Sequence, residues 1–147
     1  MTNDNSLIGT WNLASFQLEM TDGSSKHPSG EKLVGLVTYT SDGYMSGTFM
    51  KTSRPNYNSP DPMLATPEES DAAMKSYVGY AGSYSVRGDR VIHHVTVSWF
   101  PNWSGTDIER RFEVRDNRLF LRTPSIAIGG VQAVSVGVWQ RVHAPMI

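Results

Sequence analysis

The stretch TDIERRFEVR, residues 106–115, carries the pattern that decides the fold. Successive residues of a β-strand point to opposite sides, so alternate positions share a face. This rule divides the stretch into a mostly apolar face and a charged face: Ile108, Arg110, Phe112 and Val114 against Glu109, Arg111, Glu113 and Arg115. The apolar face is therefore predicted to point into the interior of a β-structure.

Outward from this stretch, the same alternation recurs along the chain, punctuated by Gly, Asp, Asn and Pro. It predicts eight strands: Gly9–Met20, Leu33–Thr40, Tyr44–Met50, Gly82–Val86, Arg90–Trp99, Thr106–Arg115, Arg118–Thr123 and Gln132–Val142. One short helix is predicted between the third and fourth strands. It begins after Thr66, where a capping Thr precedes Pro67 and Glu69, and runs to about Tyr80.

The connections between these strands alternate in length. Residues 41–43, 87–89 and 116–117 form tight turns, whereas the remaining links are long: 21–32, 51–81, 100–105 and 124–131. In an up-and-down array, every second connection lies at the same end, so one end is closed and the other open. We predict an all-β, eight-stranded antiparallel up-and-down barrel, a single domain over residues 1–147. A β-sandwich with open edges remains an alternative to the closed barrel.

Composition and charge narrow the function classes. Thirteen basic residues balance fourteen acidic ones, so no electrostatic footprint for nucleic acid is present. No apolar run is long enough for a membrane span, and the polar N-terminus lacks a secretion signal, so we expect a cytoplasmic location. Without cysteine or a glycine-rich phosphate loop, no cofactor is expected. The formation of a homodimer remains an alternative that the sequence does not decide.

Arg110 is the charged residue on the apolar face of the 106–115 stretch. An unpaired cation in an apolar interior is costly, so Arg110 needs a partner there. That partner is either a ligand carboxylate, phenolate or enolate, or a hydrogen-bonding neighbour within the protein. Arg110 is thus a candidate for both ligand binding and catalysis.

His93 and His94 are adjacent on one predicted strand and point to opposite faces. The apolar pattern favours His93 inside, but a bulge or a shorter loop would turn His94 inward instead. The inward histidine would supply a proton donor or acceptor near Arg110, so both are candidate catalytic residues. Because the two side chains diverge, no metal site is expected.

Further candidate ligand contacts are aromatic. They lie on predicted inward faces or in the loop at the open end: Tyr39, Tyr84, Trp99, Phe112, Trp139 and Trp103. Together they suit a small aromatic or polyketide-like molecule, although each ring alone fits ordinary core packing as well. The segment 51–81 either caps the mouth or covers the outer wall of the barrel with its helix.

Two terminal motifs resemble a known signature. Gly9-Thr10-Trp11 opens the first strand and Trp139-Gln140-Arg141 ends the last, as in lipocalins and calycins, where an Arg packs on the first-strand Trp. Longer stretches, including residues 39–46, 80–84 and 93–106, resemble the lipocalin-like domain family of microbial proteins. The resemblance implies a calycin-type barrel. Both strand ends fall at the predicted closed end, so Arg141 is expected to lie over Trp11 there.

Three functions follow as hypotheses. The first is binding of a small, mostly apolar molecule in the barrel. The second is a cofactor-independent isomerase or cyclase of secondary metabolism, as the resemblance implies for some barrels of this kind, with Arg110 stabilising an oxyanion and His93 or His94 moving a proton. The third is a solid barrel that serves as a structural or interaction domain.

Overall fold

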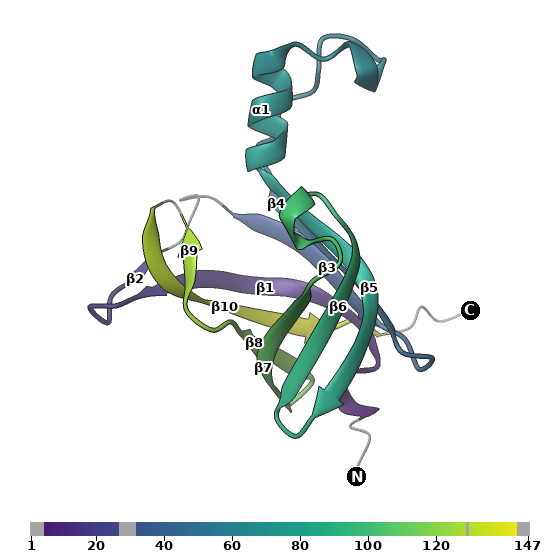
Figure 1. The fold of residues 1–147 in the computed structure, drawn as a ribbon, viewed down its shortest axis with the longest axis vertical. Helices are drawn as coiled ribbons and strands as arrows, with labels where there is room; N and C mark the ends of the chain where they lie inside the picture. The colour runs from purple at the N-terminus through teal and green to yellow at the C-terminus, as the bar shows by residue number, and fades with distance from the viewer. Residues whose placement is uncertain (1–4, 27–31, 129, 144–147) are drawn as a thin grey trace.

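A computed structural model describes residues 5–26, 32–128 and 130–143 (Figure 1). In these residues, eight long antiparallel strands form a ring: β1 (Gly9–Met20), β3 (Leu33–Tyr39), β4 (Tyr44–Lys51), β5 (Tyr77–Arg87), β6 (Arg90–Ser98), β7 (Asp107–Arg115), β8 (Arg118–Arg122) and β10 (Val131–Arg141). Each strand pairs with the next, and β1 pairs with β10 to close the barrel. The predicted eight-stranded barrel is confirmed.

Short elements complete the described chain. The strands β2 (Ser25–Lys26) and β9 (Ile126–Ile128), which the sequence did not predict, pair with β1 and β10 at the end of the barrel away from the tight turns. Single-turn helices are η1 (Asn5–Leu7), η2 (Pro62–Leu64) and η3 (Pro101–Trp103). Among the described residues, no helix is long and apolar enough to cross a membrane.

The helix α1 (Pro67–Lys75) begins as predicted, because Thr66 and Glu69 cap it reciprocally. It ends before the predicted Tyr80. Residues 77–80 instead pair with β4, so β5 begins at Tyr77 rather than Gly82. No residue of α1 is buried, and the helix stands above the ends of β4 and β5 instead of lying on the outer wall (Figure 1).

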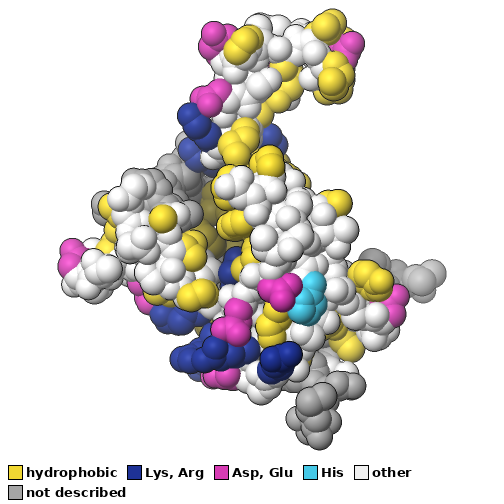
Figure 2. Space-filling view, viewed as in Figure 1, with side chains coloured by type: hydrophobic (Ala, Val, Ile, Leu, Met, Phe, Trp, Pro, Cys, Tyr) yellow, Lys and Arg dark blue, Asp and Glu magenta, His cyan; other side chains and the backbone are white. Residues whose placement is uncertain are grey.

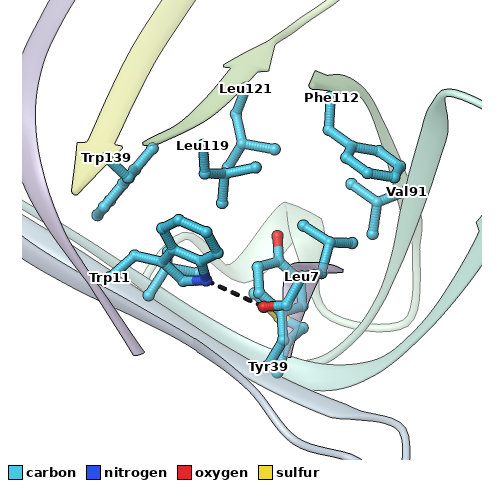
Figure 3. Close-up of a cluster of buried hydrophobic side chains, with 10 residues drawn as sticks. Leu7, Trp11, Tyr39, Val91, Phe112, Leu119, Leu121 and Trp139 are labelled. Atoms are coloured by element: carbon cyan, nitrogen blue, oxygen red, sulfur yellow. Dashed lines mark hydrogen bonds between the residues drawn. The ribbon is translucent and has the colours of Figure 1, made fainter. Parts of the chain in front are cut away.

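The tight turns mark the closed base of the barrel. The turn after β7 uses Asp116 and Asn117 with φ of 53° and 60°, a conformation suited to a two-residue hairpin. The most deeply buried side chains gather above these turns, among them Leu7 from η1, Trp11, Tyr39 and Leu119 (Figure 3). The base is therefore filled with side chains.

Arg141 seals this base as predicted. Its guanidinium carbon lies 4.1 Å from the centre of the Trp11 ring. The same group donates hydrogen bonds to the carbonyls of Ile8 at 2.8 Å and Ser6 at 2.7 Å. Gly9 has φ of +132°, and a Cβ there would lie 2.9 Å from Nη1 of Arg141. The glycine of the Gly-x-Trp motif is thus required by backbone conformation and by the approach of Arg141.

Candidate functional site

A cavity of about 350 Å³ occupies the upper half of the barrel. Figure 2 shows a hollow with apolar walls on this face of the molecule, between the segments that carry β9 and η3. Most of the lining is apolar or aromatic: Phe16, Val37, Met45, Phe49, Met74, Val78, Trp99, Phe100, Trp103, Leu121, Ile126 and Trp139. The main polar side chains within this lining are Tyr80, His93 and Arg110. The barrel interior is thus hollow above its sealed base.

Arg110 brings a positive charge into this cavity. The predicted face of β7 is confirmed, because Phe112 is buried and Arg110 lines the cavity, whereas Arg111 is exposed. Among the described residues, no aspartate or glutamate lines the cavity, and Arg110 forms no ion pair. Its Nη1 donates to the carbonyl of Glu109 at 3.3 Å, and its positive charge lowers the pKa of the Tyr80 hydroxyl in part. Its charge is therefore balanced by no described side chain.

His93 is the inward histidine. Its side chain is 2 % exposed, and it lies between two tyrosines. The hydroxyl of Tyr39 is 2.7 Å from Nε2, and the hydroxyl of Tyr80 is 2.7 Å from Nδ1. A register shift between β5 and β6 occurs only beyond this point, opposite Ala81 and Gly82, so it does not turn His93 outward.

His94 lies on the outer face of the barrel. Its Nε2 is 2.9 Å from Oγ of Ser85, and its Nδ1 is 2.8 Å from Oδ1 of Asp107. The structure therefore does not bring His94 to the cavity or to Arg110. The sequence left open which of the two histidines faces the interior, and in the structure it is His93.

Burial and charge set the protonation of this cluster. Burial, reinforced by the positive charge of Arg110 and by His94, lowers the pKa of His93 to about 3, so its imidazole is neutral near pH 7. Burial raises the pKa of Tyr39 well above its ordinary value. It also raises the pKa of Tyr80, which Arg110 lowers in part. The cavity thus holds neutral hydrogen-bonding groups beside one cation.

An aromatic cluster forms one side of the mouth. The ring of Trp99 meets that of Trp103 edge-on at 5.2 Å between centroids, and Trp103 meets Tyr80 edge-on at 5.6 Å. The indole N–H of Trp99 is buried and has no hydrogen-bond partner among the described residues. Met74 of α1 also lines the cavity, so the helix contributes to the mouth.

The predicted contact residues divide into two levels. His93, Trp99, Trp103, Arg110 and Trp139 line the cavity. The remaining three lie outside the lining: Tyr39 is beneath His93, Tyr84 packs edge-on against Tyr39 and donates to the carbonyl of Thr40, and Phe112 belongs to the buried core.

Tyr80 is the main residue that the sequence reasoning missed. It was assigned to the end of the helix, although it shares the parity of Tyr84 and Val86 in β5. Extending the two-residue alternation backwards from Tyr84 would have placed Tyr80 on the inward face.

Comparisons with known proteins agree with a barrel of this type. The sequence profile of a family described as a lipocalin-like domain matches residues 8–142. A 4'-hydroxy-3'-methoxypropiophenone carrier protein, ppsC, of Aspergillus oryzae is 31% identical over 107 residues, which cover 67% of this chain and 96% of that protein.

Two solved structures are also similar to the chain. A lipocalin-like protein of Bacteroides uniformis has a TM-score of 0.48 and 14% identity, covering 93% of this chain and 99% of that one. The fatty acid transporter REP1-NXSQ has a TM-score of 0.45 and 14% identity, covering 95% of this chain and 98% of that one.

Proposed function

The chain belongs to the lipocalin-like domain family, and we propose that its barrel binds one small, mostly apolar aromatic molecule with an oxygen acceptor at one end. One observation carries the proposal: a cavity of about 350 Å³ with aromatic walls is lined by Arg110, which forms no ion pair with any residue that the structure describes. Small-molecule sites are typically apolar pockets of about 300–1,000 Å³ with a few fixed polar groups. A solid barrel used only as a scaffold does not fit such a cavity.

The ligand class that fits best is an aryl ketone or a related phenol. The carrier protein of A. oryzae is named for such a molecule, with a ketone at one end of an aromatic ring and hydroxyl and methoxy groups at the other. In this chain, Arg110 and Tyr80 offer hydrogen bonds at the inner end of the cavity. The unpaired N–H of Trp99 offers another near the mouth. A buried donor without a partner costs about 1–3 kcal/mol, which a ligand oxygen would recover.

Binding of 4'-hydroxy-3'-methoxypropiophenone, measured by calorimetry and by quenching of tryptophan fluorescence, tests the proposal. We expect saturable binding of one molecule per chain. Arg110→Met should weaken it at least tenfold, equivalent to about 1.4 kcal/mol, because it removes the cation from the cavity. Arg111→Met is the matched control, since Arg111 is the adjacent, outward-facing residue near Asp89, and it should leave the affinity unchanged. Equal affinity of the two variants, or no saturable binding, would contradict the proposal.

A cofactor-free isomerase or cyclase is the second candidate, favoured by the Tyr39, His93 and Tyr80 cluster beside Arg110. Tyr80 and Arg110 would stabilise negative charge that develops on a substrate oxygen. A histidine with a pKa near 3 is a weak base, so the base that removes a proton beside the ketone would be solvent, and Tyr80 and Arg110 would polarise the carbonyl. The test is deuterium uptake next to the ketone of the bound probe in D₂O, followed by NMR. No acceleration over solvent, or equal acceleration by Tyr80→Phe, would exclude this role.

A further inference from the structure

We propose that Tyr39, His93 and Tyr80 form a hydrogen-bond chain with one fixed direction, from the sealed base toward the cavity, and that this direction makes the polar end of the cavity selective for oxygen acceptors. The inference deepens the proposed function and rests on it for the ligand. It adds the direction of the hydrogen bonds that makes the site accept oxygen acceptors and reject ammonium groups, and it assigns Tyr80 as the residue that donates to the ligand.

The first step concerns His93. A neutral imidazole has one N–H donor and one nitrogen acceptor. Nε2 and Nδ1 each lie 2.7 Å from a tyrosine hydroxyl, so one tyrosine donates to His93 and the other accepts from it. Burial beside Arg110 keeps the ring neutral, which excludes donation to both tyrosines.

The second step concerns Tyr39, which is 1 % exposed. Among the described residues, the structure gives its hydroxyl one hydrogen-bond partner, Nε2 of His93. If Nε2 carried the proton, the hydrogen of the Tyr39 hydroxyl would be buried without an acceptor, which folded proteins avoid. Tyr39 therefore donates to Nε2, and the proton of His93 lies on Nδ1.

The third step follows at Tyr80. Its oxygen accepts from Nδ1 of His93, so this bond does not use the hydrogen of the Tyr80 hydroxyl. Tyr80 lines the cavity, which leaves that hydrogen to point toward a ligand. Arg110 also has only donors to offer.

The polar end of the cavity therefore presents donors from two residues, Tyr80 and Arg110. A ketone, carboxylate or phenolate oxygen satisfies both donors. An ammonium group satisfies neither and is repelled by Arg110. For an aryl ketone, the carbonyl would lie at Tyr80 and Arg110, with the ring toward Trp103, which packs edge-on against Tyr80.

The direction of the chain is tested without ligand by ¹⁵N NMR of the histidine side chains, with His93 assigned by its loss in His93→Gln. The nitrogen shifts distinguish the two neutral tautomers, and we expect the proton on Nδ1. A proton on Nε2 would overturn the inference.

The acceptor selectivity is tested by infrared spectroscopy of 4'-hydroxy-3'-methoxypropiophenone labelled with ¹³C at the carbonyl. We expect the bound C=O stretch to fall below its frequency in an apolar solvent, and Tyr80→Phe to reverse part of this shift. Tyr84→Phe is the matched control, because its hydroxyl bonds the Thr40 carbonyl, and it should change nothing. An analogue of the same probe in which an amine replaces the ketone oxygen should bind at least tenfold more weakly. A bound ketone with an unshifted stretch would overturn the inference and leave the proposed function standing, whereas absence of binding would overturn the proposed function.

Discussion

The guanidinium of Arg141 lies 4.1 Å from the centre of the Trp11 ring, and both groups are held by the backbone of the residues that precede β1. Arg141 donates to Ser6 and Ile8, while the indole N–H of Trp11 donates to the carbonyl of Leu7 at 2.9 Å. The last strand, the first strand and η1 are thus fastened at one point beneath the ligand cavity.

Arg141→Met should lower the free energy of unfolding by about 2–4 kcal/mol, because it removes the contact with Trp11 and two charged hydrogen bonds. Urea unfolding followed by circular dichroism measures the change. Arg115→Met is the control, since Arg115 lies 4.7 Å from the Phe120 ring but is exposed and paired with Glu113. Its loss should cost less than about 1 kcal/mol. Similar losses in both variants would show that the seal at the base contributes little.

His93 should make the protein sensitive to acid. The pKa of its imidazole is about 3 in the folded chain and about 6.5 when unfolded, so between these values the unfolded state binds more protons. Stability is therefore full above about pH 6.5 and falls as the pH decreases toward 3, with a loss of about 2–3 kcal/mol at pH 4.5. Denaturant titrations at several pH values measure this slope.

Two histidine variants separate this effect from the titration of carboxylates. His93→Gln should flatten the decrease between pH 6.5 and 4.5, because the buried titrating group is gone. His94→Gln should retain it, since His94 lies on the outer face. If wild-type protein and His93→Gln lose stability in parallel, His93 is not the group responsible.

Met74 should affect ligand release without affecting the fold. It lines the cavity from α1, yet 44 % of its surface is exposed. Met74→Ala should leave the unfolding free energy within about 0.5 kcal/mol of wild type and increase the dissociation rate several-fold, measured by stopped-flow fluorescence. Met63, on η2, is 87 % exposed and does not line the cavity, so Met63→Ala should change neither quantity. An unchanged release rate in Met74→Ala would show that α1 does not control ligand release at the mouth of the cavity.

Substitutions at two glycines separate the effect of a smaller cavity from the effect of a backbone clash. Gly47 lines the cavity, and a Cβ there would meet Val37 Cγ2 at 3.4 Å, an ordinary contact. Gly47→Ala should fold normally but bind bulky aryl ketones more weakly, because its methyl group occupies ligand space. Gly82→Ala should instead unfold at lower temperature, since its Cβ would clash with the backbone oxygen of His94. Thermal melts and ligand titrations of both variants measure these effects. A lower melting temperature for Gly47→Ala, or an unchanged melting temperature for Gly82→Ala, would contradict the prediction.

The barrel could be predicted from the sequence because its signals are local. The alternation of Arg110 and Phe112 against Arg111 and Glu113 requires only the geometry of a strand, and it correctly assigned the inward face of β7. The pairing of Trp11 with Arg141 was predicted from the resemblance to the lipocalin and calycin signature, and the lengths of the connections placed both strand ends at the same end of the barrel.

The polar chain in the cavity was not predicted, because it depends on contacts between distant strands. Tyr39 and Tyr80 meet through His93 only after β3, β5 and β6 have joined the barrel. Tyr80 was missed because the predicted helix extended over it. In the structure, pairing with β4 replaces helical hydrogen bonds before Tyr80, so this residue belongs to β5. The two short strands β2 and β9 were missed for a similar reason, since their pairing with β1 and β10 defines them.

The pairing of β1 with β10 has a consequence for how the chain folds. It joins the two most distant strands, and the hydrogen bond between Arg141 and Ser6 spans 135 residues of sequence. Contacts of such separation form late, because the entropy of the intervening chain must be lost first. Any open sheet that forms before this pairing has two unpaired edges, which are prone to aggregate until the ring closes. The floor of the cavity is thus built from contacts between the two ends of the described chain.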